Sequence, residues 1–161
     1  MTDSLAPSLI LASVIEVESE IKTGQVRVSR LDLPEGNETD WLRVMTPFAS
    51  DGAGALFSPD PEKGDLAVLA FHGRKPVVLG FLYGGKAAMP TKKPEEKIIK
   101  TKDGSSLTLI DGEDAGIVLA DKHENRIAMT KDGITLTSKG DIKIEASGTA
   151  TIIGKTVELN P

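Results

Sequence analysis

The sequence has no cysteine, few aromatic residues and only two histidines among its 161 residues. Without cysteine, the chain has no disulfides, no thiolate metal ligands and no cysteine nucleophile. Its longest apolar runs are well short of the ~18–20 residues that a membrane-spanning helix needs, and its N-terminus lacks the basic and apolar regions of a signal peptide. A net charge of −5 and a pI of 5.1 leave no basic footprint for nucleic acid. We therefore expect a soluble protein that is made in the cytoplasm and binds no nucleic acid.

Motifs for catalysis and cofactor binding are also missing from the sequence. Neither His72 nor His123 lies in the context of a catalytic triad, and no G-x-S-x-G motif occurs. The segment Gly52–Gly54 lacks the third glycine and the following helix of a phosphate-binding loop. Acidic residues alternate over 16–20, which is typical of a solvated strand face. We predict no catalytic residue, no cofactor, no metal site and no enzymatic activity; the alternative for His123 is an ion site formed by three copies around a trimer axis.

The positions of the aromatic residues divide the chain. None follows position 83, and the segment over 84–94 is rich in glycine, proline and lysine, which is typical of a linker. We therefore predict a first domain over 1–88, a linker over 89–97 and a second domain over 98–161. The aromatic residues alternate with apolar ones, so we expect them in the core of the first domain. They are Trp41, Phe48, Phe57, Phe71, Phe81 and Tyr83.

Short apolar or alternating stretches, separated by clusters of turn-forming residues, indicate five strands in the first domain. No stretch shows the 3.6-residue period of a helix. Five short strands in a domain of this size predict an all-β barrel of the oligonucleotide/oligosaccharide-binding (OB) type. The stretches lie at 9–15, 25–31, 41–45, 66–71 and 77–83.

The second domain is repetitive. Thr101–Gly104 has the same sequence, T-K-D-G, as Thr130–Gly133, and each copy precedes an alternating strand. Glycines recur at 104, 112, 133, 140 and 148, and the short strands between them have one apolar face but no aromatic residue. Such strands cannot fill a core within one chain, whereas an interlocked trimer buries their apolar faces at an axis and pairs their edges. We predict an intertwined, homotrimeric β-helix, or β-prism needle; the rival is a single-chain β-helix of hexapeptide type, which the spacing of seven to eight disfavours.

Four segments stand in a distinctive order along the first domain. They are G-Q-V-R-V at 24–28, W-L-R-V-M-T-P-F-A at 41–49, P-E-K-G-D before an apolar strand at 61–71, and R-K-P-V-V-L-G-F-L-Y at 74–83. In this order they resemble the OB domain of phage baseplate assembly protein V and of VgrG spikes, and the repetitive tail resembles the trimeric β-helix of those proteins. The resemblance implies the structural central spike of a contractile tail: that of a phage, a tailocin or an extracellular injection system.

The resemblance also implies partners. Only a short segment precedes the barrel where VgrG proteins carry a hub domain, so we expect a separate hub protein at the OB end. The chain has no His-x-His pair of the kind that holds iron at some phage tips. We therefore expect a blunt tip covered by a conical PAAR-repeat protein, because exposed sheet ends invite association. The residues expected to bind this tip partner are Ile152, Ile153, Val157, Leu159, Asn160 and Pro161.

As a spike, the protein is expected to dock on the hub and pierce a target envelope, with transient contact to the target membrane. It would lie in the cytoplasm before assembly and in a virion or extracellular contractile particle afterwards. The alternative function is a trimeric OB-fold module that binds glycan or single-stranded nucleic acid on a β-helical stalk. A trimeric β-helix transferase is the enzymatic alternative, and the absence of a catalytic histidine in the repeats disfavours it.

Overall fold

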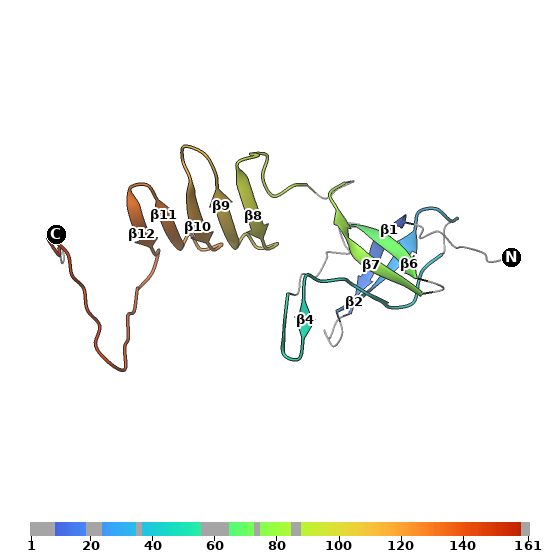
Figure 1. Ribbon diagram of the computed structural model, residues 1–161, viewed down its shortest axis with the longest axis horizontal. Coiled ribbons are helices and arrows are strands. Elements are labelled where there is room, and N and C mark those ends of the chain that lie inside the picture. Colours follow the sequence, from blue (N-terminus) through green and yellow to red (C-terminus); the bar gives the residue numbers. More distant parts are fainter. Residues whose placement is uncertain are drawn as a thin grey trace. The chain divides into compact units, whose positions relative to one another are not determined.

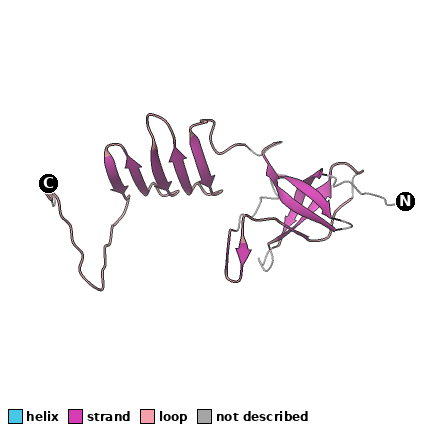
Figure 2. Cartoon of the chain, viewed as in Figure 1, coloured by secondary structure: helices cyan, strands magenta, loops and turns pink. Residues whose placement is uncertain are grey.

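The computed structural model describes residues 9–18, 24–34, 37–55, 65–72, 75–84 and 88–158. The chain divides into two compact units, residues 1–89 and 90–161. Every regular element in the described ranges is a β-strand (Figure 2), so the prediction of an all-β protein is confirmed. These ranges accordingly include no helix long and apolar enough to span a membrane.

The first unit is a nearly closed antiparallel barrel in which the strands lie in the order β3-β2-β1-β6-β7 (Figure 1). A parallel bridge between Val44, just after β3, and Val78 in β7 joins the two ends of the sheet. This arrangement confirms the predicted OB-type barrel. The strands are β1 (Leu9–Val17), β2 (Gln25–Arg30), β3 (Leu42–Arg43), β6 (Leu66–His72) and β7 (Lys75–Leu82).

The barrel core consists of small and branched aliphatic side chains that alternate along the strands. Ala12 and Val14 on β1 point inward, as do Ala67 and Leu69 on β6, and each of these four is at most 1% exposed. The remaining buried members are Val26, Val28, Leu42 and Val78. Among the described residues, the buried members of the barrel core are therefore all aliphatic, and none of them is aromatic.

The expectation that the aromatic residues lie in the core is therefore wrong for half of them. Phe71 and Phe81 do pack against the core, but Trp41, Phe48 and Tyr83 are exposed. Trp41 precedes the short strand β3, and Tyr83 follows the end of β7, so neither takes an inward position within the barrel sheet. Phe57 lies outside the described residues.

A separate hairpin follows β3. Its strands, β4 (Ala49–Ser50) and β5 (Ala53–Gly54), pair only with each other. At its base the Thr46 hydroxyl donates to the carbonyl of Ala55, whose amide donates to the carbonyl of Phe48 at 3.3 Å. Gly52 takes a φ of +67° in the turn, a conformation that favours glycine.

The second unit is a five-stranded antiparallel meander in the order β12-β11-β10-β9-β8. Short turns join consecutive strands, and Gly104, Gly112 and Gly133 take positive φ there. All five strands pair within one chain, and residues 138–158 follow without forming a strand. The antiparallel pairing also differs from a hexapeptide β-helix, in which the strands are parallel. The strands are β8 (Glu96–Lys100), β9 (Ser106–Ile110), β10 (Gly116–Ala120), β11 (Arg126–Thr130) and β12 (Gly133–Thr137).

The segment before the meander is fixed to its first strand. The Thr91 hydroxyl donates to the Glu96 carboxylate at 2.6 Å, and the Lys93 ammonium lies 3.2 Å from the same group. The Thr91 hydrogen bond, and next the hydrogen bond from Lys93, hold the pKa of Glu96 below its ordinary value. β8 thus begins at Glu96, inside the interval 89–97 that the sequence analysis assigns to a linker.

Candidate trimerisation face and tip

One face of the meander carries its large aliphatic side chains. The strand register aligns them in two rows that cross the five strands. Neighbouring strands are ~4.8 Å apart, so each row is a continuous line of contacts. We call this surface the aliphatic face. The first row is Ile99, Leu107, Leu119, Ile127 and Leu136. The second is Leu109, Ile117, Met129 and Ile134, with the charged residue Lys97 at its β8 end.

The opposite face carries smaller side chains at the intervening positions. Its central row is Ile98, Thr108, Val118, Ala128 and Thr135. Thr108 and Ala128 are buried among their neighbours on this face. Alternation along each strand therefore places most of the large apolar groups on the aliphatic face, and the opposite face has mainly smaller side chains.

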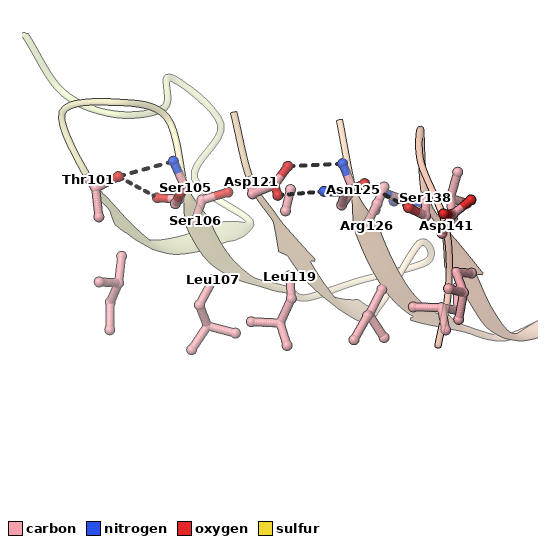
Figure 3. A pocket seen from close by; sticks show the side chains of 16 residues that line it. Thr101, Ser105, Ser106, Leu107, Leu119, Asp121, Asn125, Arg126, Ser138 and Asp141 are labelled. Atoms are coloured by element: carbon pink, nitrogen blue, oxygen red, sulfur yellow. Dashed lines mark hydrogen bonds between the residues drawn. The ribbon is translucent and has the colours of Figure 1, made fainter. Parts of the chain in front are cut away.

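The aliphatic face borders an open groove of about 610 Å³. Ile99, Leu107, Leu119, Ile127 and Leu136 line it, and Ile142, beyond the last strand, lies beside them. Figure 3 shows Leu107 and Leu119 pointing to the same side of the sheet. Leu119 remains 44% exposed and Leu136 54% exposed. A contiguous exposed apolar surface of this kind is typical of a protein–protein interface.

A polar corner holds the turn between β10 and β11. The Asp121 carboxylate accepts hydrogen bonds from the amides of His123 (2.8 Å) and Asn125 (2.9 Å) and from the Asn125 side chain (2.8 Å). The Asn125 side-chain bond makes the largest contribution to lowering the pKa of Asp121 below its ordinary value, and the two amide bonds add to it. The charged carboxylate thus stabilises the turn through these three hydrogen bonds.

Hydrogen bonds also join this turn to the residues that follow the last strand of the meander. The Asn125 side-chain oxygen accepts from the Ser138 hydroxyl and from the Lys139 amide, both at 3.1 Å. Lys139 also pairs with Glu124 at 2.8 Å. Asp121 and Asn125 therefore fix the point at which the chain leaves the meander (Figure 3). The sequence analysis missed this role, although an Asp and an Asn around a short turn are a recognised sign of side-chain capping.

Residues 138–158 are extended and carry exposed apolar side chains, among them Ile142 and Ile144. No strand of the described chain pairs with this segment. Of the predicted tip residues, Ile152 (75% exposed), Ile153 (91%) and Val157 (50%) lie within it. Leu159, Asn160 and Pro161 lie outside the described residues.

The other candidates from the sequence analysis are not members of the aliphatic face. In the alternating acidic stretch, Glu16 pairs with Arg27 at 2.9 Å, and Arg27 also pairs with Glu38. His123 is exposed in the β10–β11 turn, where its amide supports Asp121. In the described ranges, no group of three or more His, Asp or Glu residues is placed to hold a metal ion.

Comparison with known protein families adds to this geometry. Residues 10–83 match the type VI secretion system/phage-baseplate injector OB domain. Residues 97–161 match the phage baseplate V C-terminal trimerisation domain. No curated protein matches the chain. These two family matches together define a trimerising injector protein. More particularly, the chain belongs to the spike-type proteins of phage baseplates and type VI secretion systems, and it is a structural component of such particles.

Proposed function

We propose that three copies of this chain form the central spike of a contractile tail or injection system, which pierces the target envelope when the sheath contracts. The observation that supports this best is an injector OB barrel followed, in one chain, by a trimerisation domain with an exposed aliphatic face. Around a threefold axis, three such faces would make stacked aliphatic layers. Layers packed at the density of a protein interior resist compression, as axial force transmission requires.

The spike would end in a platform for a conical PAAR-repeat protein. Ile152, Ile153 and Val157 support this proposal, because three copies would gather exposed apolar side chains at one end. Leu159, Asn160 and Pro161 complete the proposed surface. The full-length chain should capture the tip protein, and a variant that lacks residues 152–161 should not. This variant should still be a trimer, with a mass smaller only by the deleted residues. Equal capture by both forms would remove the platform from the proposal.

The OB end would dock on a separate hub protein. The match of residues 10–83 to an injector OB domain supports this position in the particle. The protein would act without catalysis, lie in the cytoplasm before assembly and touch the target membrane only briefly. Its function would then depend on assembly rather than on any reacting group.

Immunogold labelling of contractile particles with an antibody against this chain tests the proposal. Gold should lie at the baseplate end of the tube, about one cluster per particle. Gold along the sheath, or particles assembled normally without the chain, would overturn it. Titration with single-stranded DNA or a glycan array addresses the alternative of a binding module, and tight, saturable binding there would favour that alternative.

A further inference from the structure

The outer side of the barrel carries an uncharged surface on three adjacent strands. Because Ala12 on β1 and Ala67 and Leu69 on β6 point inward, the residues between them point outward. The register places Leu11 beside Val68, and Leu66 beside Leu82. Leu9 extends this surface along β1. We call Leu9, Leu11, Leu66, Val68 and Leu82 the barrel wall; Leu9 is 67% exposed and Leu82 45%.

The barrel wall differs from the side formed by β2 and the segment after it. There Arg27 bonds to Glu16 and Glu38, each at 2.9 Å. Large aliphatic residues with no charge among them, next to a charged side, are a feature of interfaces rather than of free surfaces.

A second apolar surface lies at the base of the β4–β5 hairpin. Met45 and Phe48, which we call the hairpin knob, are 58% and 57% exposed. The hairpin pairs with no other strand of the described chain. An isolated two-stranded hairpin is only marginally stable in water, so packing of the knob against another surface would stabilise it.

Threefold symmetry decides how these surfaces can be used. The trimerisation domain brings three barrels together, and the segment 84–95 spans at most ~40 Å even when fully extended. Each barrel thus meets its neighbours at an effective concentration on the order of millimolar. In a ring of three, every contact joins two different surfaces, because a contact between identical patches satisfies only two chains. Among the described residues of the barrel, the wall and the knob can serve as two such unlike surfaces.

We propose that the hairpin knob of one protomer packs against the barrel wall of the next, closing the three OB barrels into a head-to-tail ring. The occupant of the wall is therefore a second copy of this chain. Phe48 supplies the ring that inserts, and Gly80, which pairs with Val68, leaves a low point in the wall that can receive it. The proposal depends on the trimerisation domain, and neither the hub nor the tip partner enters it.

The absence of cysteine in the chain makes a cross-linking test direct. The double variant Leu11→Cys/Phe48→Cys, prepared as full-length trimers isolated by chromatography, should form two- and three-chain bands after oxidation. Each single variant should remain monomeric on a denaturing gel, since a head-to-tail contact brings unlike residues together. The matched control is Glu38→Cys/Phe48→Cys, which keeps the hairpin cysteine but moves the other to the charged side, and it should also remain monomeric.

A second pair, Leu82→Cys/Met45→Cys, tests the same contact at other positions. It is needed because one cysteine pair can fail to form a disulfide when its geometry is unfavourable. Circular dichroism confirms that each variant is folded before oxidation. Covalent dimers from Leu11→Cys alone would mean that two walls meet each other, and would overturn the ring. Trimers that give no two- or three-chain bands with either cysteine pair would also overturn the ring. The barrel wall would then bind another partner, such as a hub.

Discussion

At the scale of single residues, Asn125 joins the β10–β11 turn to the segment that follows the last strand. It contacts Asp121 within its own turn, and it accepts hydrogen bonds from Ser138 and Lys139 after the last strand. Asn125→Ala removes the side-chain bonds together. Because these bonds are partly buried, the loss should lower the free energy of unfolding by about 1–2 kcal/mol per chain. Thermal melting at fixed chain concentration should show a lower midpoint than wild type. Lys122→Ala in the same turn is the control, because its ion pair with Asp103 is exposed and 3.8 Å long; equal midpoints for both variants would argue against a special role for Asn125.

The charge of Asp121 predicts a dependence on acid. Hydrogen bonds from Asn125 and the turn amides lower its pKa in the folded protein below the ordinary value of 3.8. A lowered folded pKa contributes stability that is present above the ordinary value and is lost as pH falls from there through the lowered value. Asp121→Asn has no such titration, so its melting midpoint should fall less steeply than that of wild type on acidification below pH 3.8. Parallel slopes would mean that Asp121 does not contribute to the acid response.

At the scale of elements, alternation in the sequence predicted which side chains share a face but not which strands pair. Leu107 and Leu109 are on the aliphatic face, as period-2 patterning requires. The same pattern suits pairing within a chain or between chains. The short turns between consecutive strands, three of which place a glycine at positive φ, make β8 to β12 a local meander. Likewise, the exposure of Trp41 depends on where β3 begins, and the sequence does not mark that residue.

The aliphatic face yields the element-scale prediction. Leu119 lies in the middle strand of the meander, and a fully buried leucine contributes about 1.5–3 kcal/mol. Leu119→Glu would also bring three carboxylates toward one apolar axis, so light scattering should show dissociated chains. Thr135→Glu adds the same charge on the opposite face, at an exposed position of β12, and should leave the trimer intact. A trimeric Leu119→Glu variant would show that the aliphatic face is not the interface.

At the scale of the whole molecule, the sequence predicted the OB barrel of the first unit well. The four motif segments of the sequence analysis together determine the order of its strands and turns. The sequence predicted less about the tip. Residues 152, 153 and 157 are exposed apolar positions, and the pattern within one chain carries no information on what would cover them. Wild-type protein should elute as a particle of about three times 17.1 kDa, measured by light scattering at micromolar concentration. A stable monomer there would contradict both the spike and the barrel ring.

A fragment ending at Met89 tests how the two units share stability and assembly. Every buried core residue of the barrel lies within this unit, from Ala12 to Val78, so the fragment should fold and unfold cooperatively in denaturant. It should nevertheless be monomeric at micromolar concentration. The knob has two residues and the wall has five, whereas a stable interface takes about 20–30 residues a side. Without the trimerisation domain, the two surfaces also lose the high effective concentration that closes the ring. Fusing the fragment to an unrelated trimeric coiled coil should restore oxidative cross-linking of the Leu11→Cys/Phe48→Cys pair. An unfolded fragment would place the domain boundary elsewhere, and a tight trimer of the fragment alone would mean that the barrels, rather than the aliphatic faces, provide the main contact between chains.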